Sequence, residues 1–371
     1  MRIGVPKEIK VLENRVGLTP GSVRELVHRG HELVVEDAAG QGIGVGNDDY
    51  AREGATIARS AADVFSSCDM IVKVKEPQAA ERATLWPGQI LFTYLHLAPD
   101  AEQTRDLVAS NAVCIAYETV TSPAGGLPLL APMSEVAGRL AVQAGAHYLE
   151  KPHGGKGILL GGVPGVAPAS VVVIGGGVVG THAIEIALGM GARVTVLDRS
   201  VDVLKRLWTQ YGTALQTQFS TVDALERQVA AADLVIGGVL VAGAAAPKLV
   251  TRAMIATMQP GSVVVDVAID QGGCFETSHP TTHADPTYVV DGVVHYCVAN
   301  MPGGVPRTST FALNNATLPF VVAIADKGWK RALAEDAHLQ QGLNVAFGKV
   351  TCRPVADALG YAWTDAASFL A

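Results

Sequence analysis

The stretch 171–180, VVVIGGGVVG, predicts the fold of the middle of this chain. Four β-branched residues lead into the pattern Gly175-x-Gly177-x-x-Gly180, and a helix-compatible stretch follows to about residue 191. In such a strand–turn–helix unit the first glycine permits a tight turn, the second lets a pyrophosphate approach the backbone, and the third lets the helix pack closely on the strand. The start of the helix adds unpaired N–H groups and the positive end of its dipole. The stretch therefore predicts a Rossmann-like unit that binds a dinucleotide.

An acidic residue closes the next predicted strand, 193–197, and indicates which dinucleotide binds. Asp198 follows that strand, at the distance where a carboxylate accepts hydrogen bonds from both ribose hydroxyls. A carboxylate there repels a 2′-phosphate, so NAD is favoured over NADP, although Arg199 is a contrary signal. The glycine pattern alone is weak evidence, because the chain has 40 glycines. A tight turn without a ligand is the alternative interpretation.

The composition of the chain limits which classes of protein and which partners are expected. The 371 residues are 49% hydrophobic and 17% charged, which suits a folded chain of about two domains. A net charge of −7 disfavours nucleic acid as a partner. The apolar runs are broken by Gly and Pro and the start lacks the apolar core of a signal peptide, so we expect no membrane partner. Five dispersed cysteines predict free thiols in a cytoplasmic protein, and the spacing of His, Cys and Asp predicts no metal.

The rest of the chain alternates short strands and helices before the glycine-rich stretch and turns helical after it. We predict strands at 2–5, 32–36, 70–74, 89–94 and 112–117, helices at 20–29, 98–110 and 133–149, and further helices at 312–327 and 330–345. A two-helix tail buries little core by itself, so we expect it to pack on the first domain. The predicted fold is α/β, with two Rossmann-like doubly wound domains, a cleft between them and a discontinuous first domain. The first comprises 1–130 and 307–371 and binds substrate, and 131–306 binds NAD.

Four polar residues are candidates for chemistry because each lies in a loop or just after an apolar run, where parallel sheets carry functional groups. They are Arg15, Lys75, His96 and Asp270. Each has a structural alternative: Arg15 and Lys75 as solvated loop charges, His96 as a hydrogen-bonded histidine under a sheet, and Asp270 as the cap of a turn. Asp266 competes with Asp270, but it falls inside the predicted strand, where a buried structural carboxylate is the alternative.

Several motifs together resemble the L-alanine dehydrogenase family. They are MRIGVPKE at 1–8, ENRV at 13–16, VKVKEP at 72–77, LFTYLH at 91–96, LLAPMSEVAGR at 129–139, GGVPGV at 161–166, DVAIDQGGCFE at 266–276 and VANMPGGVP at 298–306. The resemblance covers nearly the whole chain. It implies NAD-dependent oxidative deamination of L-alanine to pyruvate and ammonia, with the reverse reductive amination, in a cytoplasmic homohexamer.

The resemblance also implies roles for particular residues. Arg15 and Lys75 would hold the substrate, and His96 and Asp270 would be the catalytic pair. The residues that would contact NAD are Ser134, Gly175, Gly177, Val178, Val179, Gly180, Asp198, Ser220, Val239, Leu240, Val267, Ala268, Ile269, Asp270, Val298, Asn300 and Met301.

The sequence departs from some family members at two places. Val203 stands where some carry a basic residue that touches the adenosine end of the cofactor. Ala323 and Lys327 stand where some carry a Glu and a His that bind magnesium, so we carry over no metal. One alternative function is a transhydrogenase-like nucleotide-binding module, which would need partner membrane segments. The other is a non-catalytic NAD-binding module, which would need the dinucleotide turn but not the four chemistry candidates.

Overall fold

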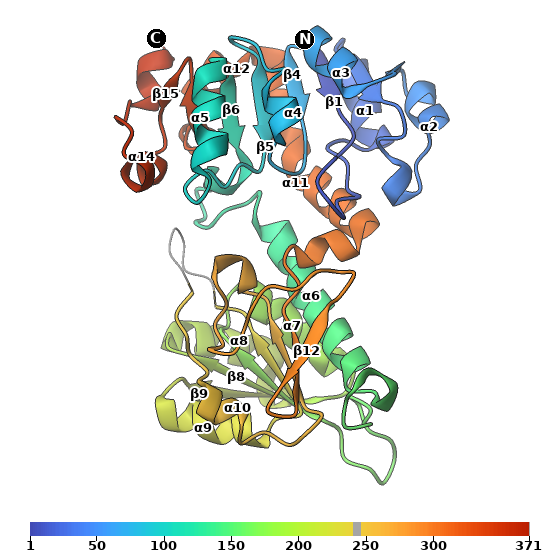
Figure 1. The fold of residues 1–371 in the computed structure, drawn as a ribbon, viewed down its shortest axis with the longest axis vertical. Coiled ribbons are helices and arrows are strands. Elements are labelled where there is room, and N and C mark those ends of the chain that lie inside the picture. Colours follow the sequence, from blue (N-terminus) through green and yellow to red (C-terminus); the bar gives the residue numbers. More distant parts are fainter. Residues whose placement is uncertain (240–245, 371) are drawn as a thin grey trace. The chain divides into compact units, whose positions relative to one another are not determined.

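The computed structural model describes residues 1–239 and 246–370. The chain folds into two compact α/β units, unit 1 formed by Met1–Met133 with Val305–Ala371 and unit 2 by Ser134–Gly304. These junctions lie within a few residues of the predicted ones at 130 and 306. Unit 1 is discontinuous, because the blue start and the orange-to-red end of the chain fold together (Figure 1). The predicted α/β class with two domains and a divided first domain is confirmed. The expected cleft stays a prediction.

Unit 1 is built on an eight-stranded sheet with the order β15-β14-β6-β5-β4-β1-β2-β3. Its strands are β1 Arg2–Val5, β2 Glu32–Glu36, β3 Thr56–Ala58, β4 Met70–Val72, β5 Ile90–Thr93, β6 Val113–Ala116, β14 Leu343–Ala346 and β15 Lys349–Val350. Its helices are α1 Pro20–His28, α2 Asn47–Arg52, α3 Ala61–Ser67, α4 Ala79–Arg82, α5 Ala101–Ser110, α11 Pro306–Lys327, α12 Trp329–Glu335, α13 Ala337–Gln340 and α14 Arg353–Leu359. The strands β1 to β6 pair in parallel, so their carboxyl ends share one edge of the sheet.

The tail of the chain corrects one prediction: the helix predicted at 330–345 is divided into α12 and α13, and its end is a strand. Asp336 accepts hydrogen bonds from His338 N and Leu339 N, which ends α12 and starts the short helix α13. The chain then forms β14, whose residues are buried and pair antiparallel with β6. The tail therefore joins the sheet of unit 1 and does more than cover it.

Helix α11 is the one helix among the described residues that is long and apolar enough, by length and composition, to cross a membrane. Core helices pass the same test, and α11 carries buried polar side chains that bond to the start of the chain. Asn314 accepts hydrogen bonds from the backbone N–H and the hydroxyl of Thr19, and its amide donates to Gly17 O at 3.0 Å. These contacts fasten α11 inside unit 1.

Unit 2 is a seven-stranded sheet with the order β12-β13-β11-β10-β7-β8-β9, in which β12 and β13 pair antiparallel and the other pairs are parallel. Its strands are β7 Ser170–Ile174, β8 Arg193–Asp198, β9 Leu215–Phe219, β10 Leu234–Gly237, β11 Val263–Asp266, β12 Thr287–Val290 and β13 Val293–Tyr296. Its helices are α6 Ala131–Tyr148, which begins at the junction, α7 Val178–Gly189, α8 Val201–Tyr211, α9 Val222–Ala231 and α10 Arg252–Ile255. Short 3₁₀ turns follow at η3 Lys151–His153, η5 Ile269–Gln271 and η6 Met301–Gly304.

The apolar run that begins the glycine motif is a central strand buried on both faces. Val171 and Val173 belong to one core cluster of unit 2, whereas Val172 and Ile174 belong to another. Successive side chains of a strand point to opposite faces, so both faces of the sheet are covered. This burial holds the glycine turn at the carboxyl end of a rigid element.

Candidate active-site residues

The glycine turn has the geometry that each of its three glycines was expected to provide. Gly175 has a left-handed φ of +95°, and Gly177 is the residue that precedes the first turn of α7. A Cβ built at Gly180 would lie 1.8 Å from Gly175 O, so helix and turn are in close contact there. A Cβ built at Gly177 would meet nothing within 4 Å. The space beside Gly177, at a helix N-terminus, fits an approaching phosphate group.

Asp198 ends β8 beside this turn. Its carboxylate accepts hydrogen bonds from Gly176 N and Ser200 N, both at 2.7 Å, so its orientation is fixed. Ser220 follows β9 and donates its backbone N–H to Asp198 O, which brings these two candidates together at one edge of the sheet. A carboxylate has further lone pairs, so Asp198 keeps the capacity to accept ribose hydroxyls.

Sequence reasoning missed Arg206. Its Nη2 donates to Gly176 O at 2.7 Å, so a cation from α8 holds a carbonyl of the glycine turn. Val203, one helical turn earlier, packs against the same glycine, because a Cβ at Gly176 would lie 2.6 Å from Val203 Cγ1. Val203 and Arg206 are three residues apart on α8 and therefore lie on the same face of the helix, and this spacing could have indicated Arg206.

Asp266 and Asp270 have different environments, as their sequence positions suggested. Asp266 is wholly buried and accepts hydrogen bonds from Ala268 N, Cys274 N and the Ser278 hydroxyl. Burial raises the pKa of this carboxyl, and the hydrogen bonds oppose that shift. Asp270 instead lies exposed in η5, where Asn300 N donates to its Oδ1 at 3.3 Å. Asp266 thus fixes the loop, whereas the exposed carboxylate of Asp270 keeps the capacity to accept further hydrogen bonds.

The remaining cofactor candidates in unit 2 differ in what they can offer. Ala268, Ile269, Val298 and Met301 have buried side chains, so backbone atoms are what they could present to a cofactor. Four others lie at the ends of elements: Ser134 in the first turn of α6, Val178 and Val179 at the start of α7, and Val267 directly after β11. Val178 is the most exposed of the four. Val239 packs beside Gly175, and Leu240 lies outside the described residues.

In unit 1, Arg15 is buried and held by Glu13. Its Nε donates to Glu13 Oε1 at 2.7 Å and its Nη2 to Glu13 Oε2 at 2.5 Å, while Nη1 faces Met133 Sδ at 3.0 Å. Burial disfavours the charge, but the hydrogen bonds and charge of Glu13 outweigh it and raise the pKa of Arg15. The guanidinium is therefore a permanent cation in a fixed orientation.

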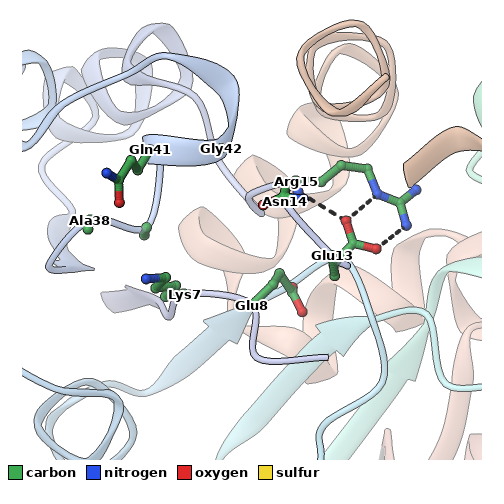
Figure 2. Close-up of a pocket in the computed structure, with 9 residues that line it drawn as sticks. Lys7, Glu8, Glu13, Asn14, Arg15, Ala38, Gln41 and Gly42 are labelled. Carbon is green, nitrogen blue, oxygen red and sulfur yellow. Dashed lines mark hydrogen bonds and ion pairs between the residues drawn. The ribbon is translucent and has the colours of Figure 1, made fainter. Parts of the chain in front are cut away.

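A cavity of about 160 Å³ lies beside this ion pair. Figure 2 shows the carboxylate of Glu13 turned toward the guanidinium, with Glu8 on its other side. The lining residues are Lys7, Glu8, Glu13, Asn14, Arg15, Ala38, Ala39, Gln41 and Gly42. Charged groups of both signs line the cavity, which suits a small polar ligand more than an apolar one.

Glu8 also fixes the backbone before Lys75. Its Oε1 accepts hydrogen bonds from Val74 N at 2.7 Å and Lys75 N at 3.3 Å, and its Oε2 lies 3.2 Å from the buried Lys73 Nζ. Lys73 Nζ also donates to Glu81 Oε1 at 2.6 Å. Sequence reasoning missed this buried network, although a lysine inside an apolar strand signals that carboxylates must lie nearby.

His96 lies just past β5 in a left-handed conformation, with φ +50°. Its backbone N–H donates to Glu118 Oε1 at 2.6 Å, and its ring stacks on Tyr94 with 5.7 Å between centroids. The imidazole is exposed, so the alternative of a histidine buried under the sheet is wrong. Thr93, which ends β5, donates to Lys75 O at 2.9 Å, so Lys75 and His96 follow neighbouring strands at the same edge.

Comparisons with known proteins agree over nearly the whole chain. Family models described as alanine dehydrogenase/PNT, N-terminal domain and C-terminal domain match residues 4–137 and 141–353. A protein of Halomonas elongata named alanine dehydrogenase is 64% identical over 370 residues, and one of Mycolicibacterium smegmatis with the same name is 53% identical over 371, each covering 100% of both chains.

Two solved structures are also similar. One titled L-alanine dehydrogenase is 52% identical with a TM-score of 0.94 and covers 97% of this chain and 99% of its own. A transhydrogenase from Sinorhizobium meliloti is 25% identical with a TM-score of 0.81 and covers 95% of this chain and 99% of its own.

Proposed function

The chain belongs to the alanine dehydrogenase/PNT family, and we propose that it catalyses the NAD-dependent oxidative deamination of L-alanine to pyruvate and ammonia, with the reverse amination. The observation that carries the proposal is 64% identity, over the full length, to a protein named alanine dehydrogenase. The four chemistry candidates in the sequence support an enzyme over a module that only binds nucleotide. We further propose a cytoplasmic homohexamer, which sedimentation and fractionation would test.

NAD is the proposed cofactor because the residues of unit 2 fit its parts. The open space at Gly177 and the start of α7 suit the pyrophosphate, and the carboxylate of Asp198 suits the two ribose hydroxyls. When bound, NAD⁺ would supply the hydride acceptor. Arg206, which holds Gly176 O, would keep the turn in the shape that admits the phosphates.

Arg15 and Lys75 would bind the carboxylate and carbonyl region of the substrate. Charge-assisted hydrogen bonds from two cations orient a small acid strongly, which lowers the entropic part of the barrier. Glu13 would hold the Arg15 guanidinium in one orientation, and Glu8 would hold the backbone that carries Lys75. Small side chains of the substrate would be distinguished weakly, by about 1–3 kcal/mol per methylene.

His96 and Asp270 would move the protons. Once the α-carbon is oxidised, water must add to the imine and a proton must reach the departing ammonia. The exposed imidazole of His96 can both donate and accept a proton, which suits that exchange at the carbonyl oxygen. The carboxylate of Asp270 would stabilise the positive imine and accept a proton from water or amine.

The test is the appearance of NADH absorbance when the protein is mixed with NAD⁺ and L-alanine at alkaline pH, in the wild type and in His96→Asn. Asparagine tolerates the left-handed φ at position 96 better than alanine. We expect kcat to fall by about two to four orders of magnitude with NADH affinity unchanged. His28→Asn, which changes an exposed histidine on α1, is the matched control. Turnover near wild type in His96→Asn would remove His96 from the mechanism, and no NADH from the wild type would refute the proposed function.

A further inference from the structure

We propose that His147, Glu150 and His153 form a binding site for a divalent transition-metal ion of the Zn²⁺ class on the surface of unit 2. Among the described residues, they are the group of three His, Cys, Asp or Glu side chains close enough to hold an ion, with one ligand atom from each within 4.8 Å of the others. The site does not depend on the proposed reaction.

The local fold brings the three side chains together. His147 lies in the last turn of α6, and η3 begins three residues after that helix ends. Glu150 N donates to His147 O, and Glu150 O accepts hydrogen bonds from His153 N and Gly155 N, so the chain makes two tight turns in succession. These turns bring the His153 ring to 3.8 Å from the His147 ring, centroid to centroid. Spacing along the chain did not reveal this, and we therefore revise the expectation that the chain has no metal site.

The backbone of this turn is fixed before any ion binds. A Cβ at Gly155 would lie 2.3 Å from Tyr148 O, so the backbone at Gly155 packs closely against the end of α6. Gly154 has a left-handed φ of +88° and ends η3. A fixed backbone means that ion binding costs little ordering of the chain.

The ligand atoms are near the separation that coordination requires. His147 Nδ1 lies 3.9 Å from Glu150 Oε1, and His153 Nε2 lies 3.8 Å from Glu150 Oε2. Tetrahedral zinc with bonds of about 2.1 Å separates its ligands by roughly 3.4 Å. These two distances use different oxygens of Glu150, and with one ligand atom from each residue the three lie within 4.8 Å of one another. Side-chain adjustments of up to about 1.4 Å therefore bring them to this spacing.

The donor set indicates which ion binds. Two imidazoles and one carboxylate suit Zn²⁺, Co²⁺ or Ni²⁺, whereas Mg²⁺ and Ca²⁺ prefer oxygen ligands. The C-terminal end of α6 carries the negative end of the helix dipole, which also favours a cation. Three protein ligands leave at least one position for water, and the half-exposed side chains allow the ion to enter from solvent.

The experiment is a calorimetric titration of ZnCl₂ into the full-length chain after treatment with a chelator. We expect one zinc site per chain that is lost, or weakened at least about tenfold, in each of His147→Asn, Glu150→Gln and His153→Asn. The matched control is His182→Asn, because His182 lies near Glu135 and Glu185 but is not part of the group of three. MgCl₂ should not compete, and Co²⁺ should give visible absorbance that the same three variants lose.

Thermal unfolding with and without chelator separates binding from misfolding. The three variants should unfold like the wild type when chelator is present, and Zn²⁺ should raise the unfolding temperature of the wild type alone. Unchanged zinc affinity in His147→Asn and His153→Asn would overturn the proposal, as would equal binding of Mg²⁺.

Discussion

Two glycines of one turn are expected to respond in opposite ways to the same substitution. Gly177 has φ −69° and ψ −160°, and a Cβ there meets nothing within 4 Å. Gly180 lies in the first turn of α7, where a Cβ would lie 1.8 Å from Gly175 O and 3.3 Å from Val173 Cγ1. Alanine therefore fits at 177 and clashes with backbone at 180, so Gly177→Ala tests cofactor binding without disturbing the fold.

The magnitudes follow from these contacts. Gly177→Ala should leave the free energy of unfolding unchanged or raise it by up to about 1 kcal/mol, because alanine restricts the unfolded chain at no steric cost. Gly180→Ala should lower it by about 1–3 kcal/mol or more, since the contact is with backbone that cannot swing aside. At 177 the methyl would occupy the space proposed for the pyrophosphate. Losing one charge-assisted hydrogen bond of about 1.5–3 kcal/mol weakens NADH binding roughly tenfold to a hundredfold.

The assay pairs NADH fluorescence titration with denaturant unfolding of the apoprotein. Gly189→Ala is the matched control, because it lies at the far end of α7 and its added Cβ also meets nothing within 4 Å. It should change neither NADH affinity nor, beyond about 1 kcal/mol, stability. NADH affinity of Gly177→Ala equal to that of the wild type would refute the placing of the pyrophosphate at this glycine.

Three further outcomes follow from polar contacts. Asp198→Asn keeps an acceptor for the turn but removes the charge, so the ratio of kcat/KM for NADP to that for NAD should rise about tenfold or more, as measured by initial rates. Asp266→Asn leaves at least one buried donor unpaired and should lower the free energy of unfolding by about 1–3 kcal/mol in denaturant titrations; an unchanged midpoint would contradict this. Glu335 on α12 pairs with Lys327 and Arg331, which lower its pKa from 4.5 to about 2. Its stabilising effect is therefore present above the unfolded pKa and lost as pH falls toward 2. Wild type and Glu335→Gln should differ in stability at neutral pH and converge in acid. The difference at neutral pH should be smaller in high salt, which screens exposed charges. A difference that grows as pH falls would show the sign to be wrong.

Much of the fold can be predicted from the glycine and charged residues that bound the apolar runs of the sequence. Strand β2 was predicted with its observed bounds, because an apolar run lies between Gly30 and an acidic residue. The predictions failed where tertiary pairing decides. The composition of residues 343–346 predicts the end of a helix, but these residues pair with β6 and form a strand instead. The antiparallel turn between β12 and β13 has Asp291 and Gly292 both at positive φ, a hairpin signal that was not used.

The candidate residues themselves could be found from sequence because each follows an apolar run or lies in a motif. Their supporting contacts could not, since Glu8, Glu13 and Arg206 act through hydrogen bonds to backbone or to one neighbour. A motif indicates a candidate for ligand contact, whereas the group that orients that candidate is set by three-dimensional packing. Glu8 illustrates this, because it lies in the loop after β1 and its carboxylate accepts a hydrogen bond from Val74 N, in the loop after β4.

The charges around Arg15 indicate how an acidic substrate would be bound. The carboxylates of Glu8, Glu13 and Glu81 pair with two buried cations, Arg15 and Lys73, so these five groups carry a net charge of −1 when all are ionised. Affinity for a carboxylate would then not come from an excess of positive charge. It would come from the directions of N–H donors that Glu13 and Glu8 hold in place, because oriented dipoles and fixed ion pairs need no rearrangement when an anion arrives. A chain that buried the same cations without these carboxylates would lose the orientation of its donors and with it the selectivity for a planar acid.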